Sequence, residues 1–209
     1  TVVPDSHAAE EKNEENRKIL QKAIIHSSAT DNKSELITRI DLNVVDGMIR
    51  AIKEFRITKV IIGWYSQTTT FSFLFSNILD KLLKKTEKMV LVCKLNTPIE
   101  LIGNIYVFLQ ENVEYEKGFG DLVRTLKNLA KHTNRDLRLY SNYNTSDAFQ
   151  RELTRKKYKL EPRYINEHIN SQLFEKIKKE KLSDNDLVVL VKARKNTISH
   201  NKLIDTYPK

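Results

Sequence analysis

Short apolar runs alternate with amphipathic segments along the first half of this 209-residue chain. Lys59–Gly63 and Met89–Leu95 have the pattern of buried strands, and Thr1–Pro4 and Glu35–Ile40 look like shorter strands. Between these strands, apolar residues recur at helical spacing on three stripes: Ile19, Leu20, Ala23 and Ile24; Val45, Met48, Ile49 and Ile52; Phe75, Ile78, Leu79 and Leu82. Strands that alternate with covering helices predict a parallel sheet with right-handed crossovers.

The same rhythm begins again after Asn96-Thr97-Pro98. The segments expected there are the strands Asn104–Gln110, Asp136–Tyr140, Tyr158–Ile165 (apart from Pro162) and Leu187–Val191, and the helices Gly120–His132, Ser146–Lys157 and Glu167–Lys179. We therefore expect an α/β protein of two tandem doubly wound parallel-sheet units, residues 1–97 and 98–209. Superposed, the two halves describe one five-stranded unit: the first lacks its first strand and helix, and the second lacks its last helix and strand.

Composition excludes several classes of protein. The net charge of +9 is spread over both halves without an Arg-rich arm, so no nucleic-acid partner is expected. The single cysteine, Cys93, rules out an internal disulfide and suits a reducing compartment. It lies in an apolar run, which favours a small buried side chain over a reactive thiolate. Apolar runs of only a few residues predict a soluble, cytoplasmic chain.

No catalytic constellation stands out. The five histidines are not spaced as metal ligands, and the chain has neither a Gly-x-Ser-x-Gly elbow nor a phosphate-binding loop that ends in Lys-Ser/Thr. Acidic pairs such as Glu14-Glu15 are typical of solvated faces. We therefore expect no enzyme activity and no metal site.

The repeated unit resembles the universal stress protein fold, most closely between Asp41 and Leu95. In that family a third strand ends in Asp and a fourth ends in Gly. A phosphate-binding loop, a helix that opens with Gly-Ser and a closing apolar strand then follow. Here Arg39-Ile40-Asp41 and Val60–Gly63 match the two strand ends, Ser76–Asp80 stands at the helix start, and Val90–Val92 matches the closing strand.

One subgroup of that family is similar in further detail, namely the tandem universal-stress-like domains in the cytoplasmic C-terminal region of bacterial monovalent cation–proton antiporters. Gly63-Trp64-Tyr65, followed by a Phe/Leu-rich segment and Ile78–Leu82, looks like what those regions carry. The resemblance implies a regulatory domain joined to a membrane transport domain of the same polypeptide and so tethered to the inner membrane. It also implies a homodimer formed through Met89–Cys93. The alternatives are a free-standing tandem universal stress protein that binds adenine nucleotide, and a basic nucleic-acid-associated protein.

The resemblance also points to a ligand site. Family members that bind ATP use Gly-x-x-Gly and a later Gly-Ser or Gly-Thr, because glycine lets the backbone approach phosphate. Gly63 keeps the first position, and other residues replace the remaining glycines. The candidate ligand-binding residues are Asp41, Gly63, Trp64, Ser66, Ser76 and Asn77, for ATP, AMP or another anion. An ordinary strand-to-helix connection is the other interpretation.

A second candidate anion patch follows the last predicted strand. Lys192, Arg194 and Lys195 cluster there without a glycine. A solvated basic loop explains them equally well.

The strand that the first half lacks is central in this fold, beside the fourth strand. Its absence predicts unpaired backbone groups or a gap in the first sheet. Three explanations are open: the strand lies outside these residues, the sheet is rearranged, or another chain supplies the strand.

Overall fold

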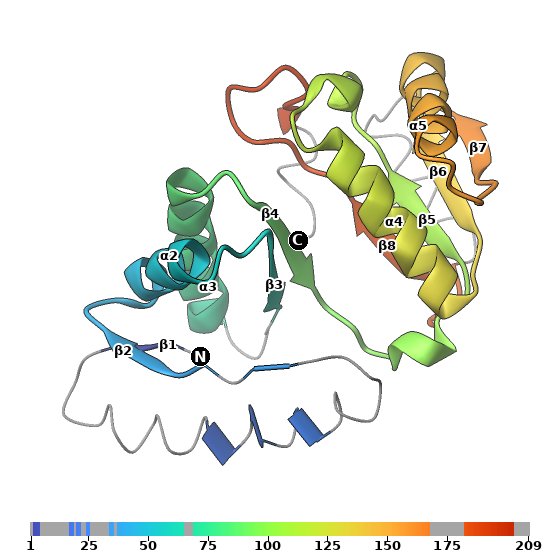
Figure 1. Ribbon diagram of the computed structural model, residues 1–209. Helices are drawn as coiled ribbons and strands as arrows, with labels where there is room; N and C mark the ends of the chain where they lie inside the picture. Colours follow the sequence, from blue (N-terminus) through green and yellow to red (C-terminus); the bar gives the residue numbers. More distant parts are fainter. Residues whose placement is uncertain are drawn as a thin grey trace. The chain divides into compact units, whose positions relative to one another are not determined.

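The computed structural model describes residues 2–4, 17, 18, 20, 21, 24, 25, 34, 35, 37–64, 69–167 and 182–202 (Figure 1). The chain divides into two compact units, Thr1–Lys94 and Leu95–Lys209. This boundary lies three residues before the predicted one. Both units contain parallel strands flanked by helices, so the predicted α/β class with parallel sheets is confirmed.

The described part of the first unit contains the strands β1 (Val2–Pro4), β2 (Arg39–Asp41), β3 (Lys59–Gly63) and β4 (Met89–Cys93). β3 and β4 are parallel neighbours, with Val60 opposite Val90 and Ile62 opposite Val92, as predicted. The expected single sheet is wrong, however. The strands form two separate pairs, β1 with β2 and β3 with β4. Within the described residues, no strand joins the two pairs.

Among the described residues, α2 (Val44–Glu54) and α3 (Thr69–Lys85) cover the strands of the first unit. α2 begins after Asn43, whose side chain accepts a hydrogen bond from the Asp46 amide and so caps the helix. α3 ends in two lysines, which favour the negative end of its dipole. Val45, Ile52 and Leu82 are buried together, and apolar residues of α2, α3, β3, β4 and the loop after α2 pack around them: Met48, Ile49, Ile57, Val60, Ile62, Ile78 and Val90.

Gly47 allows α2 to lie close to the first strand pair. A Cβ atom at this position would lie 2.5 Å from Cγ1 of Val2 and 3.0 Å from Cβ of Asp41. Alanine favours a helix over glycine by about 1 kcal/mol, but overpacking costs about 1–3 kcal/mol. We expect Gly47→Ala to lower the free energy of unfolding by about 1 kcal/mol, measured by urea titration of Trp64 fluorescence.

Gly118→Ala is the matched control, because no atom lies within 4 Å of a Cβ built there. Its effect should stay within about 0.5 kcal/mol. If Gly47→Ala instead stabilised the first unit, the close approach of α2 to Val2 would be wrong.

The second unit has a continuous four-stranded parallel sheet. Its strands are β5 (Ile105–Phe108), β6 (Leu137–Ser141), β7 (Arg163–Asn166) and β8 (Leu187–Leu190), in the order β7-β6-β5-β8. Its helices are α4 (Phe119–Thr133) and α5 (Tyr143–Arg155), with short 3-10 helices at Ile99–Leu101 and Val113–Tyr115. All three strand pairs are parallel.

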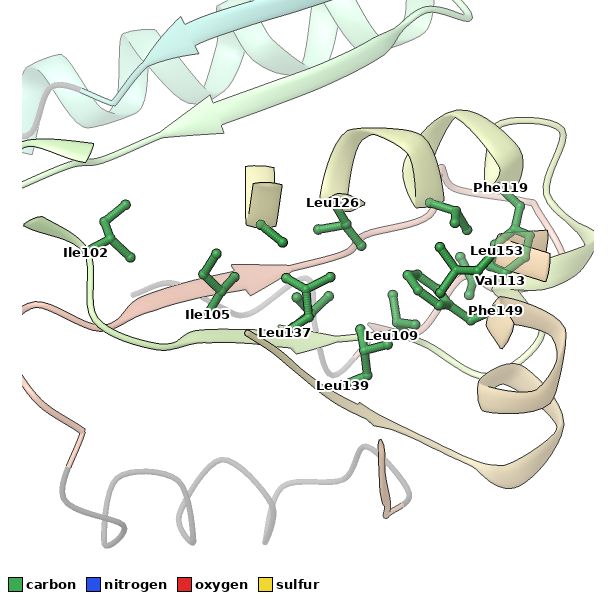
Figure 2. Close-up of a cluster of buried hydrophobic side chains, with 13 residues drawn as sticks. Ile102, Ile105, Leu109, Val113, Phe119, Leu126, Leu137, Leu139, Phe149 and Leu153 are labelled. Carbon is green, nitrogen blue, oxygen red and sulfur yellow. The ribbon is translucent and has the colours of Figure 1, made fainter. Parts of the chain in front are cut away.

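β5 is the most deeply placed strand of the second unit. Ile105 and Val107 point into the larger apolar cluster, whereas Tyr106 and Phe108 point to the opposite face. Figure 2 shows the larger cluster between α4, α5 and the sheet. Its buried members are Ile102, Ile105, Val107, Leu109, Val113, Phe119, Val123, Leu126, Ala130, Leu137, Leu139, Phe149 and Leu153. Burial on both faces is typical of a central parallel strand.

Several predicted elements differ from the observed ones. β7 begins only at Arg163, directly after Pro162, because proline has no N–H to donate to a strand ladder. α5 begins three residues before the predicted Ser146, since Asn142 caps it by accepting from the Thr145 amide. The predicted helix with the stripe Ile19, Leu20, Ala23 and Ile24 and the predicted helix Glu167–Lys179 lie largely outside the described residues. None of the described helices combines the length and apolarity needed to cross a bilayer.

Candidate functional site

The carboxyl ends of the strands are the candidate site, because ligands of doubly wound folds bind there. We call this edge of a sheet its rim. In the second unit, the segment after β8 covers the rim and is held there by hydrogen bonds. Gln110, which follows β5 and is 2 % exposed, accepts a hydrogen bond from the Ala193 amide at 3.0 Å. Gln110 therefore holds the segment after β8, residues 191–202, against the end of β5.

Glu116 makes a second attachment to the same segment. Its Oε1 accepts hydrogen bonds from the amide of Ser199 at 3.1 Å and from the hydroxyl of Ser199 at 2.6 Å. Ser199 is buried, with an exposed fraction of 3 %. The loop after β8 is thus tied to the sheet at one point and to the residues before α4 at another.

The Glu116 contacts predict a pH dependence. Burial alone raises the pKa of this carboxyl, but hydrogen bonds from Ser199 and Thr197 outweigh burial, and the pKa of Glu116 is lowered from 4.5. A lowered folded-state pKa stabilises the fold above pH 4.5, and the stabilisation disappears as pH falls through the lower folded value. We expect the protection of the Ser199 amide against hydrogen exchange, taken relative to the intrinsic exchange rate at each pH, to fall as the pH drops below 4.5.

Glu116→Gln is the control for this pH dependence. Glutamine keeps an acceptor oxygen but does not titrate in this range. Exchange at Ser199 in this variant should lose its acid-dependent step. A step that persisted unchanged would assign the pH dependence to another group.

Polar groups also meet at the ends of β6 and β7. The hydroxyls of Ser141 and Ser146 lie 2.7 Å apart, and the Ser146 hydroxyl donates to Oδ1 of Asn166 at 3.3 Å. Thr145 donates to Glu114 at 2.8 Å, which links the start of α5 to the 3-10 helix after β5. These groups join β6, β7, α5 and the 3-10 helix after β5, so their polar atoms satisfy one another at this edge of the sheet.

The second candidate patch lies on the segment that Gln110 and Glu116 hold. Lys192 and Lys195 are exposed, and Arg194 is half-buried. The Arg194 carbonyl accepts from the Thr197 amide at 3.3 Å and from the Thr197 hydroxyl at 3.0 Å, which forms a tight turn. The three cations therefore stand on a fixed turn beside the closed rim.

In the first unit the candidate residues belong to different strand pairs. Asp41 ends β2 with 7 % of its surface exposed, and its Oδ1 accepts from the Leu42 amide at 2.9 Å. Nη2 of Arg50 lies 3.5 Å from the same oxygen. Gly63 ends β3, and the half-buried Trp64 donates its amide proton to the Cys93 carbonyl at 2.7 Å. A Cβ at Gly63 would meet no atom within 4 Å.

Ser76 and Asn77 do not stand where the sequence placed them. Both are exposed residues inside α3, which begins at Thr69, about two turns earlier. Amides in the interior of a helix bond to carbonyls four residues back, so those of Ser76 and Asn77 are not available to an anion. The helix start that the family resemblance implies at Ser76 is therefore not observed. Ser66 lies outside the described residues.

The described residues of the second unit line two cavities. One of about 560 Å³ lies between the 3-10 helix after β5 and α5, where Glu114, Tyr115 and Arg151 line it. The other, of about 850 Å³, is bordered by Arg138, Arg163 and the segment before β7. Both carry acidic and basic side chains together, so neither is a site for one sign of charge.

The structure also bears on the reactivity of Cys93 and on the possibility of a metal site. Cys93 is half-buried, and burial raises the pKa of its thiol, which disfavours the reactive thiolate form. Within the described residues, no group of three or more His, Cys, Asp and Glu side chains is arranged to hold a metal ion.

The contacts of Gln110, Glu116 and Ser199 were not predicted. The sequence signal was present for Gln110 alone, as a polar residue directly after an apolar run. Glu116 and Ser199 are 83 positions apart, and no local pattern connects them.

Comparison of the chain with protein-family models, with curated proteins and with solved structures found no match.

Proposed function

We propose that the chain is a non-catalytic regulatory module of a monovalent cation–proton antiporter, built from two universal-stress-like units. The main observation in favour is the difference between the two rims. Gln110 and Glu116 close the rim of the second unit from within, whereas Gly63 in the first unit stands in open space. A unit whose rim is covered by its own chain suits a structural role or the transmission of a conformational change. A unit whose rim is accessible suits the binding of a ligand.

The proposed ligand is an anion or a nucleotide such as ATP or AMP, bound near Gly63. The exposed end of β3 leaves the backbone approachable, which is the feature that phosphate recognition needs. Trp64, the next residue, offers an aromatic face on which a base could stack. The Arg50 guanidinium near Asp41 adds a positive charge to the same unit.

Binding at the first unit would regulate transport by shifting a conformational equilibrium. A ligand changes such an equilibrium only by the difference in its affinity for the two states. In this proposal the transport domain belongs to the same polypeptide, lies in the inner membrane, and holds the ion-conducting chemistry. The module pairs with a second copy through Met89–Cys93 and takes no nucleic acid.

The second candidate is a free-standing tandem universal stress protein that binds adenine nucleotide. The open surroundings of Gly63 favour it equally, because both candidates need backbone access at that point. The two differ in whether a transport domain belongs to the same polypeptide.

Calorimetry with ATP, AMP, cyclic nucleotides and inorganic phosphate tests the ligand site. Gly63→Val should weaken binding at least about tenfold without loss of fold, since a side chain there meets no protein atom. Gly118→Val is the matched control in the second unit, because a side chain there also meets no protein atom, and it should leave the affinity unchanged. Absence of heat with every ligand would remove the nucleotide and anion part of the proposal.

The upstream coding sequence tests the antiporter assignment. About a dozen apolar segments of about 20 residues would support it, and a start codon directly ahead of Thr1 would end it. Proton-coupled cation exchange can then be measured in vesicles for the whole transporter and for a variant without residues 1–209. The two proteins should differ in the dependence of the exchange rate on pH or on ligand.

A further inference from the structure

Both helices of the second unit end at the amino-terminal edge of its sheet, opposite the rim. α4 leads into β6 and α5 leads through a short segment into β7, and these strands are parallel, so both helices end at the same edge. Nζ of Lys127 on α4 lies 4.8 Å from the centre of the Tyr158 ring, which follows α5. This contact joins the two helix ends into one surface.

The surface at these helix ends is strongly basic. We call the side chains of residues 126–138 and 156–163 the basic face. It carries eight cations against two carboxylates, which are Asp136 and Glu161. Lys127 and Arg138 are half-buried, and the other cations are exposed: Lys131, Arg135, Lys156, Lys157, Lys159 and Arg163.

Ion pairing distinguishes the basic face from the rest of α4 and α5. Every arginine of the two helices has a carboxylate partner three or four residues earlier: Arg124 with Asp121, Arg151 with Asp147, and Arg155 with Glu152. Among the described residues, by contrast, no carboxylate lies within ion-pair distance of a cation of the basic face. The positive charge of this face is therefore not neutralised by the protein around it.

The backbone at Lys157 indicates a use for this charge. Lys157 follows the end of α5 with φ 52°, and Asn134 ends α4 in the same left-handed conformation with φ 53°. Glycine or asparagine ordinarily occupies this position, because a longer side chain is strained there. The helix dipole favours cations only within the last turn, so it does not account for Lys159 or Arg163, which lie beyond the helix.

The basic face suits many anionic groups in a surface better than a single bound anion. The cavity of about 850 Å³ that Arg138 and Arg163 border also contains Asp136 and Glu161, so positive charge is not concentrated at one point. Most of the cations are lysines, which act as point charges on flexible stems. Such side chains adapt to an uneven layer of anions without fixed geometry.

The groups that would read a nucleic acid base are already engaged. Lys127 lies over the ring of Tyr158, so that face is not open to a stacking base. Gln150, at the border of the same cavity, accepts a hydrogen bond from the hydroxyl of Tyr164 at 2.8 Å. These contacts favour a lipid surface over a nucleic acid.

We propose that the basic face of the second unit binds the surface of an anionic phospholipid bilayer. The choice of a bilayer rests on the proposed membrane transport domain, whereas the charge of the face does not. Clusters of four to eight Lys and Arg residues beside a membrane bind anionic headgroups, and each cation strengthens binding about fivefold. In this orientation the rim of the second unit, at the opposite edge of the sheet, points away from the bilayer.

Cosedimentation of the 209-residue chain with lipid vesicles tests the proposal. The chain should bind vesicles of phosphatidylcholine with about one-third phosphatidylglycerol, and it should not bind phosphatidylcholine alone. Binding should weaken as salt rises from about 0.05 M to about 0.5 M, because salt screens exposed charges. Lys156→Gln with Lys159→Gln should weaken binding about 20-fold, and Glu161→Gln should strengthen it about fivefold.

Lys117→Gln with Lys202→Gln is the matched control. It removes the same charge from exposed positions of the second unit outside the basic face, and it should change binding by no more than about twofold. Three outcomes would overturn the proposal. The first is no binding to anionic vesicles at low salt, and the second is equal weakening by the two pairs of substitutions. The third is tighter binding to RNA or DNA with the same dependence on Lys156 and Lys159, which would assign the face to a nucleic acid.

The vesicle experiment and the test of the antiporter assignment can fail separately. Vesicle binding by a chain that has no transport domain upstream would keep the basic face as a membrane site and end the antiporter assignment. A transport domain upstream of a chain that does not bind anionic vesicles would end only the proposal for the basic face.

Discussion

Phe149→Ala is expected to lower the free energy of unfolding of the second unit by about 3–5 kcal/mol. Phe149 is fully buried on α5, and its ring meets that of Phe119 edge-on, with centroids 6.4 Å apart. Truncation removes apolar burial and leaves a cavity where α4 and α5 meet the sheet (Figure 2). Urea unfolding, followed by hydrogen exchange at Val107 in the central strand, measures the loss.

Tyr143→Ala is the matched control on the same helix. Tyr143 is 71 % exposed, so its truncation should change stability by no more than about 0.5 kcal/mol. A comparable loss in both variants would mean that aromatic truncation weakens α5 itself, and the cavity argument for Phe149 would then be wrong.

Leu82→Ala should destabilise the first unit by about 2–5 kcal/mol. Leu82 has no exposed surface, and among the described residues it is buried together with Val45 and Ile52. Its truncation leaves a cavity between α2, α3 and β3–β4. Trp64 is the single tryptophan and lies in this unit, so its fluorescence during urea unfolding reports the change.

Leu42→Ala removes the same side chain from a position that is 78 % exposed. It should shift the urea midpoint little, because almost no apolar surface is uncovered. If Leu82→Ala were equally mild, α3 would not pack on the sheet in the way described.

Local patterns predicted the elements that carry their own signals. The boundaries of β3 were predicted correctly because an apolar run stands between polar segments, and Asn43 caps α2 through a contact three residues away. The parallel pairing of β3 with β4 was also predictable, because two strands joined by a helix that covers the sheet run in the same direction.

The candidate ligand site was predicted less well. Family likeness placed a helix start at Ser76, but the apolar segment before it continues the helix back to Thr69. Helix formation is cooperative, and once a turn exists each further residue adds a hydrogen bond at little cost. Asp41 and Gly63 were correctly placed at strand ends, but they end strands of different pairs.

The order of residues by itself determined the alternation of strands and helices, the two-unit division and the parallel class, because periodicity and caps act over a few residues. Only the tertiary structure decided which rim is closed. The contacts of Gln110 with Ala193 and of Glu116 with Ser199 each join residues 83 positions apart. It also decided that the first sheet is split, since strand pairing depends on which strand lies in the middle. Such contacts form only when the whole chain brings distant backbone groups within hydrogen-bond distance.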